Sequence, residues 1–173
     1  MPRLSAIVHT QNDQHRIARL LESLRPCNEV LVIDHSSTDE TVTVAKHHGA
    51  LVKQGIPGVE HGTYVLDLRH HWVLSVLPSE ALSEALEAAL FEWRELSEDE
   101  CDQLGYAIRI REETGDGWRF LSPEMRLANR ARINWTSAIP PAAPGVPALD
   151  GDLLRFLEPV PGDRSGLLAD ALE

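Results

Sequence analysis

The chain has 173 residues, of which 43% are hydrophobic and 25% are charged, so it is long enough for one domain with a buried core. Its 27 acidic residues outnumber 16 basic ones, which gives a net charge of −11, and no run of lysine or arginine occurs. Nucleic acids and anionic membrane surfaces require a basic face on their partner, so this composition argues against both.

The sequence also lacks the usual signals of export and membrane insertion. The N-terminal stretch MPRLSAIVHT does not have the charged, apolar and cleavage regions of a signal peptide. No segment approaches the roughly 20 consecutive apolar residues that cross a bilayer. Cys27 and Cys101 lie far apart without a disulfide or metal-binding spacing, which is typical of reduced thiols in the cytosol. We therefore expect a cytoplasmic protein with no membrane span.

The first half of the sequence alternates short apolar runs with amphipathic segments. We expect strands over residues 4–8, 30–33, 50–53 and 72–77, and helices from Asn12 or Asp13 to Leu24, over 38–48 and around 64–70. Ser37 and Glu40 have the spacing of a capping box for the second helix, and Gly49 is placed to end it in a left-handed conformation. This alternation predicts βαβ units, a mostly parallel sheet and an α/β fold.

The second half begins with an amphipathic helix, expected over 79–96, and with Ser97 and Glu100 placed to cap a short turn. The alternation of residues 107–111 and the turn TGDG predict a β-hairpin, and EMRLANRARINW predicts one more strand. The proline-rich IPPAAPGVPALDG should be extended. We therefore divide the chain into a domain over 1–139 and, over 140–173, a Pro-rich segment and tail that pack on the domain or extend from it. The last residues form a short helix or fray.

Polar side chains gather where the second strand ends. Asp34 follows the apolar run VLVI, and Ser36, Ser37, Thr38 and Asp39 come directly after it. In open α/β sheets ligands bind outside the carboxyl ends of the strands, and helix N-termini attract anions. Ser37 and Asp39 are explained by helix capping alone. Asp34 is not needed for a cap, so we expect either that it accepts hydrogen bonds from a ribose or base, or that it bonds to its own loop.

The stretches LSAIVHTQNDQHRIARLLESL and NEVLVIDHSSTDETVTVAKHHGALV resemble the N-terminal half of family 2 glycosyltransferases of the GT-A fold, over roughly residues 4–95. The subgroup resembled includes transferases that decorate the lipopolysaccharide core of the bacterial cell envelope. The resemblance implies a truncated, Rossmann-like three-layer α/β sandwich that binds a nucleotide-sugar. It also implies that the nucleotide-binding residues are Thr10, Asn12, Asp34 and Asp39; Ser37, Thr38 and Thr41 also fill motif positions.

The chain departs from this family where a metal would bind. Relatives carry Asp-x-Asp-Glu after the strand that contains Trp72, and they use it to hold Mg²⁺ or Mn²⁺. Here the stretch is WVLSVLPSE, so Leu77 and Ser79 replace the two aspartates and Glu80 alone remains. We expect no metal cofactor, unless Mg²⁺ or Mn²⁺ is held by a site rebuilt from residues outside the motif. Glu80 is a weak candidate ligand; the simpler expectation is that Ser79 caps the long helix and Glu80 lies in its first turn.

No catalytic residue can be assigned. Relatives usually have an acidic base in the later segment, where Glu124 is a weak candidate and a surface role is the simpler one. Arg69 is the clear cation before Trp72, and the sequence does not place it on a phosphate. Among eight histidines, His9 and His35 fall near the ends of neighbouring strands, which allows a metal cluster with Glu80 as a minor alternative.

Three hypotheses follow. The first is a glycosyltransferase-like pseudoenzyme that binds a nucleotide or nucleotide-sugar weakly and has lost or impaired metal-dependent transfer. The second is an active, divergent, metal-independent hexosyltransferase. The third is a non-catalytic interaction domain with a protein partner. The altered Asp-x-Asp motif favours the first and third, and the intact Asp34 favours the first.

Overall fold

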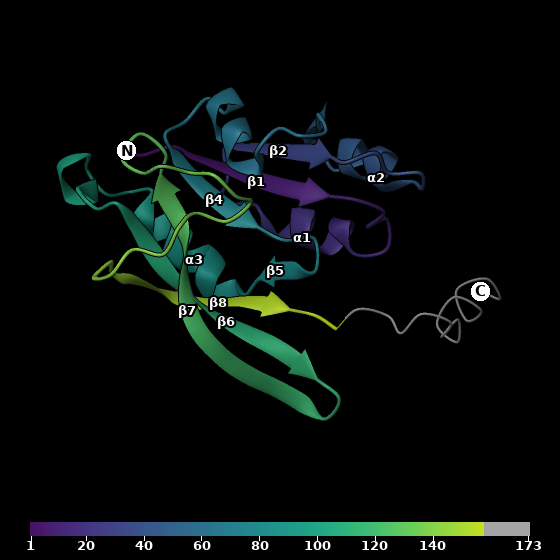
Figure 1. The fold of residues 1–173 in the computed structure, drawn as a ribbon. Coiled ribbons are helices and arrows are strands. Elements are labelled where there is room, and N and C mark those ends of the chain that lie inside the picture. Colours follow the sequence, from purple (N-terminus) through teal and green to yellow (C-terminus); the bar gives the residue numbers. More distant parts are fainter. Residues whose placement is uncertain (158–173) are drawn as a thin grey trace.

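The computed structural model describes residues 1–157, and within them eight strands form one mixed sheet in the order β3-β2-β1-β4-β7-β6-β8-β5 (Figure 1). The parallel half consists of β1 (Leu4–Thr10), β2 (Glu29–Asp34), β3 (Leu51–Gln54) and β4 (Trp72–Val76). β1, β2 and β4 are rich in Val, Ile, Leu and Ala and largely buried, which suits strands covered on both faces, whereas β3 at the sheet edge is mostly exposed. The α/β prediction is confirmed.

The other half of the sheet is built on the predicted hairpin. β6 (Gly105–Thr114) and β7 (Gly117–Asn129) pair antiparallel around a short turn, and β7 joins the sheet beside β4. EMRLANRARINW is not a separate strand, because its first six residues complete β7. β8 (Ala148–Arg155) follows the proline-rich segment and lies parallel to β6, and β5 (Glu80–Leu82) pairs with β8. Residues 158–173, which include the expected C-terminal helix or frayed end, lie outside the described part.

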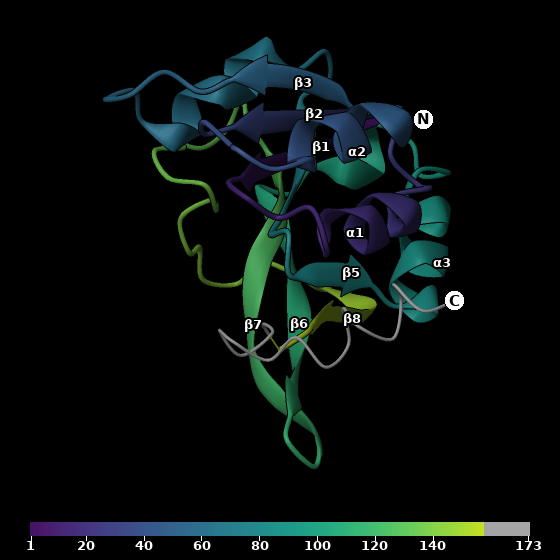
Figure 2. The same ribbon diagram turned by 90° about the vertical axis from the view of Figure 1, so that its right-hand side faces the viewer.

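Both faces of the sheet are covered. α1 (Ile17–Ser23), α2 (Thr41–His47) and α3 (Glu84–Trp93) lie on one face, where Ala6 and Val8 of β1 share a core with Leu20 and Leu90 (Figure 2). The 3₁₀ helix η1 (His61–Asp67) covers the other face, where Ile7 packs with Tyr64 and Val65. A second 3₁₀ helix, η2 (Asp99–Cys101), follows α3, and the predicted bonding of Ser97 to Glu100 is present there.

Two helix starts differ from the predictions. The expected helix over 79–96 is shorter: β5 occupies residues 80–82, and α3 begins at Glu84 with Ser83, not Ser79, as its N-cap. The expected capping box of α2 is wrong, because the Ser37 hydroxyl donates to Asp34 and the helix begins only at Thr41. For α2, the hydroxyl expected to cap the helix is bonded to the strand-end carboxylate instead. The first helix also starts later than expected, at Ile17.

Candidate functional site

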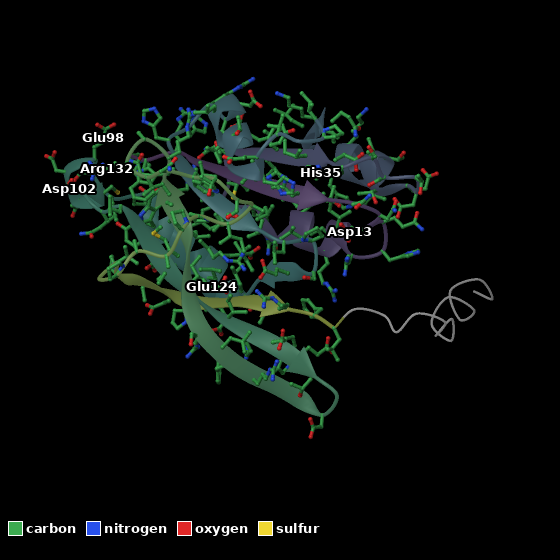
Figure 3. All side chains as sticks on the ribbon, viewed as in Figure 1. Asp13, His35, Glu98, Asp102, Glu124 and Arg132 are labelled. Atoms are coloured by element: carbon green, nitrogen blue, oxygen red, sulfur yellow. The ribbon has the colours of Figure 1, made fainter. Side chains whose placement is uncertain are left out.

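The carboxyl ends of β1, β2 and β4 meet at one edge of the sheet. Thr10 is paired with Asp34 in the strand register, and the backbone N–H of His35 donates to the Thr10 carbonyl at 2.9 Å. A cleft of about 520 Å³ opens there, lined by residues from these strand ends and by His61. A smaller cleft of about 280 Å³ adjoins it, shares Asp13 and Ser79 with it, and extends to Arg19 and Phe156. Figure 3 shows Asp13 and His35 at this edge.

Another cleft of about 520 Å³ lies at the opposite edge, where the parallel strands begin. It contains Arg69, which the sequence did not place, together with Arg132 and Glu98 (Figure 3). Arg69 therefore lies at the other end of the strands from Thr10 and Asp34.

The structure brings the four predicted nucleotide-binding residues to the same edge and engages each in internal hydrogen bonds. Thr10 is buried, and its hydroxyl donates to Asp13 at 2.6 Å. Asn12 has a positive φ of 54°, and its side-chain oxygen accepts from the backbone N–H of Thr38 at 2.8 Å. The bond between Asn12 and Thr38 joins the loop after β1 to the loop after β2.

Asp34 is 2% exposed. One carboxylate oxygen accepts the Ser37 hydroxyl at 2.5 Å, and the other accepts the Ser37 backbone N–H at 3.1 Å. Because a carboxylate has about four lone-pair directions, two acceptor positions remain after these bonds. Thus Asp34 holds its own loop with half of its acceptor capacity, and it is not among the residues that line the two clefts at this edge.

Asp39 fixes the start of α2. It accepts the hydroxyl of Thr41 at 2.5 Å and the Thr41 backbone N–H at 2.9 Å. Partial burial raises the pKa of Asp39, but the hydrogen bonds from Thr41 and Gln14 outweigh it and lower the pKa below its usual value.

The position of the family's metal motif is filled by a different arrangement. Glu80 is fully buried and forms a two-pronged ion pair with Arg126, with both nitrogen–oxygen distances at 2.9 Å. It also accepts from Arg155 at 3.1 Å and from the backbone N–H of Leu77 at 2.8 Å. The expectation that Glu80 lies in the first turn of the long helix is therefore wrong, because it belongs to β5. Its two oxygens already accept four hydrogen bonds, and the side chain of the neighbouring Leu77 has no atom that can bind a metal. These residues therefore do not fit Mg²⁺ or Mn²⁺.

Arg126 is the centre of this network. Burial alone would lower the pKa of its guanidinium, but Glu80 and Glu124 together raise it above its ordinary value. Glu124, the weak candidate for a base, is half-exposed on β7 and accepts from Arg126 at 2.8 Å (Figure 3). It therefore has a structural partner, and it lies away from the edge that carries Asp13 and His35.

Histidines do gather at the cleft, although the third member of the cluster is His61 and not Glu80, which the sequence analysis considered. His9 Nδ1 lies 2.8 Å from His35 Nε2, and His61 stacks on both rings with centroid distances of 4.4 and 4.5 Å. Burial, followed by the neighbouring imidazoles, lowers the pKa of His9 to about 3, and burial and His61 lower that of His35. Glu80 is bonded inside the core instead, so the His9–His35–Glu80 cluster does not form.

Several residues of this edge were missed by the sequence reasoning. Asp13, interpreted only as a helix cap, accepts from Thr10 and pairs with Arg16, while its backbone N–H donates to Thr41 at 2.8 Å. His61 lies after a Gly/Pro loop without periodicity, so no signal linked it to His9. The sequence signal that could have identified Arg126 is a single arginine among apolar residues of a strand, which indicates a buried charge that needs an acidic partner.

No protein-family model matches the chain. Curated proteins of Rickettsia typhi and Rickettsia felis, each called an uncharacterized glycosyltransferase, are 32% identical over 114 residues, which is 64% of this chain and 39% and 40% of theirs. The chain thus spans about two fifths of the length of the curated relatives it matches. Among solved structures, S. aureus TarS 1-349 superimposes with a TM-score of 0.54 at 22% identity, over 66% of this chain and 37% of that one.

These similarities agree with the topology. The described residues have the GT-A glycosyltransferase fold, with a mixed sheet whose parallel half carries the candidate edge. Within residues 1–157, no helix has the length and apolar character needed to cross a membrane.

Proposed function

We propose that this domain is glycosyltransferase-like and binds a nucleotide or nucleotide-sugar weakly at the carboxyl edge of β1, β2 and β4, with its Mg²⁺- or Mn²⁺-dependent glycosyl transfer lost or impaired. The names of the curated relatives support the class of function. The cleft at the strand ends supports the location, since ligands of open α/β sheets bind at such edges.

The observation that carries the proposal is that Glu80 is engaged in a buried ion-pair network. Its two oxygens accept from Arg126 and Arg155, and Leu77 stands where the resemblance to family 2 glycosyltransferases implies an aspartate. A metal ion that neutralises a leaving diphosphate contributes several kcal/mol, and about 1.4 kcal/mol corresponds to a tenfold change in rate. A chain without that ion therefore keeps the ability to bind a nucleotide more readily than the ability to transfer a sugar.

The second candidate is metal-independent transfer, and one observation favours it. Arg16 and Arg19 line the smaller cleft, next to Asn12 and Ser79. The guanidinium of Arg19 can bind a diphosphate without a metal ion, whereas that of Arg16 is already paired with Asp13. Product formation from a nucleotide-sugar in EDTA, abolished in the Arg19→Gln variant, would establish this candidate in place of the first.

Calorimetry with UDP, GDP and dTDP in EDTA tests the binding proposal. We expect millimolar or tighter binding of one of them, and an affinity loss of ~1–2 kcal/mol in Asp34→Ala, near the lower end for a hydrogen bond to a charged group. Ser37→Ala is the matched control, because it removes the hydroxyl, one of the two internal donors of Asp34, and keeps the carboxylate. Unchanged affinity in Asp34→Ala would place the nucleoside elsewhere. No binding of any nucleotide to the wild type would favour an interaction domain.

A further inference from the structure

We propose that His9, His35 and His61 form a binding site for a divalent transition-metal ion of the Zn²⁺, Co²⁺ and Ni²⁺ class. Within residues 1–157 they are the one group of three histidine, cysteine or acidic side chains whose ligand atoms converge. The site lies in the cleft at the carboxyl edge of β1 and β2. Although the site shares its cleft with the proposed nucleotide site, the proposal does not rest on nucleotide binding, because it requires only the three imidazoles and a metal ion.

The fold brings these side chains together by strand alternation. Successive residues of a strand point to opposite faces, so His9 shares a face with Ile7, and His35 continues the face of Ile33. Ile7 and Ile33 pack against Tyr64 of η1 in the same core cluster. His61 is the first residue of η1, so the helix that covers this face also delivers the third imidazole.

The distances are close to those of a metal site. The candidate ligand nitrogens all lie within 4.8 Å of one another. Zn–N bonds of about 2.0–2.1 Å in tetrahedral geometry require the nitrogens to be roughly 3.3 Å apart. The three rings are stacked, with interplanar angles of 9°, 16° and 25°, so coordination requires rotation of the side chains until their lone pairs converge. His61 is exposed and has the freedom to make most of this rotation.

The other two imidazoles are held by their surroundings. The edge of the His9 ring contacts Tyr64 at a centroid distance of 5.8 Å, and the Tyr64 hydroxyl is fixed by the backbone N–H of Ile56 at 2.7 Å. His35 lies against Gly55, where an added Cβ would come within 2.5 Å of its Nδ1. A side chain at residue 55 would therefore displace the His35 ring, and glycine leaves room for it.

The donor atoms define the class of metal. Three imidazoles favour Zn²⁺, Co²⁺, Ni²⁺ and Cu²⁺, whereas Mg²⁺ and Ca²⁺ need oxygen ligands. Three protein ligands leave a fourth position for water or a ligand oxygen, as in metal sites that act on substrates. The net charge of −11 also favours cation binding over the whole surface. This site differs from the family's acidic motif in position and in ligand chemistry.

Isothermal titration of metal-free protein that carries no polyhistidine tag tests the proposal, with ZnCl₂ as titrant and visible absorption of the Co²⁺ complex as a second readout. We expect one equivalent to bind, and His61→Ala and His35→Asn to weaken binding by about 100-fold, at least as much as the loss of an outer-shell partner. Gly55→Ala keeps all three histidines and should weaken binding by about tenfold through the position of His35.

His47→Ala/His48→Ala is the control, since it removes two exposed histidines of α2 and its end. We expect it to bind Zn²⁺ as the wild type does, and thermal unfolding in EDTA should show that all variants are folded. Equal Zn²⁺ affinity in the wild type, His61→Ala and His35→Asn would overturn the proposal. So would the absence of saturable Zn²⁺ binding to the wild type.

Discussion

The buried ion pair of Glu80 and Arg126 makes a sharp prediction about stability. Glu80→Gln keeps the size of the side chain and removes its charge. Arg126 would remain fully buried, with the amide oxygen of the new side chain and the Ser75 carbonyl as neutral acceptors and the half-exposed Glu124 as its remaining charged partner. The variant therefore isolates the contribution of one carboxylate to a buried cation.

The magnitude follows from these partners. Removing one member of a buried ion pair costs about 3–5 kcal/mol, because the other charge is left uncompensated. Glu124 still compensates Arg126 in part, so we expect the lower end, about 3 kcal/mol of the free energy of unfolding. For a chain of this length that corresponds to a fall in Tm of roughly 6–12 °C.

Urea unfolding followed by tryptophan fluorescence measures this loss. Glu92→Gln, an exposed change on α3, is the matched control and should stay within about 0.5 kcal/mol of the wild type. The double variant Glu80→Gln, Arg126→Met should be more stable than Glu80→Gln alone, because it removes the unpaired charge. A loss below about 1 kcal/mol in Glu80→Gln would refute the reasoning, since the carboxylate would then be available as a ligand.

Three further predictions concern the strand edge and its support. In EDTA, the free energy of unfolding should fall as the pH drops below 6.5, by up to about 1.4 kcal/mol per pH unit. Burial lowers the pKa of His9 to about 3 in the folded state, so the unfolded chain takes up the proton first. His9→Asn should flatten this slope between pH 6.5 and 5, and an equal slope in urea titrations would contradict it. Gly62→Ala should lose more than about 2 kcal/mol in thermal unfolding, because its Cβ would lie 2.1 Å from the Trp135 carbonyl, while Gly115→Ala, with open space, should be neutral. Asn12→Gly keeps the left-handed backbone and should lose about 1 kcal/mol with its bond to the loop after β2; no loss would show that this bond is not formed in solution.

The parallel half of the fold could be predicted from the sequence because each element has a local signal. The run VLVI indicates a strand covered on both faces, and the positive φ of 81° at Gly49 agrees with its expected place at a helix end. The start of α3 could not be found in this way. Residues 80–82 have the composition of a helix, but their pairing with β8 depends on a strand about 70 residues later.

The site was predictable to a similar extent. The polar cluster at the end of β2 pointed to the edge of the sheet where the cleft opens, because parallel strands place their carboxyl ends together. The buried role of Glu80 depends on Arg126, which is 46 residues away in the chain. Likewise, His61 reaches His9 only through the packing of η1 on the sheet. Such partners are set by the tertiary fold, and no spacing in the sequence encodes them.

The effect of Mg²⁺ on nucleotide affinity tests the central claim most directly. Mg²⁺ is chosen because imidazoles do not hold it, so the histidine cluster does not contribute. UDP, or whichever nucleotide binds best, is titrated by calorimetry into the same preparation in EDTA and then in saturating Mg²⁺. We predict equal affinities within about twofold, because Glu80 is held by two arginines and Leu77 offers no oxygen ligand. A gain of about tenfold or more in Mg²⁺ that disappears in Glu80→Gln would contradict the claim.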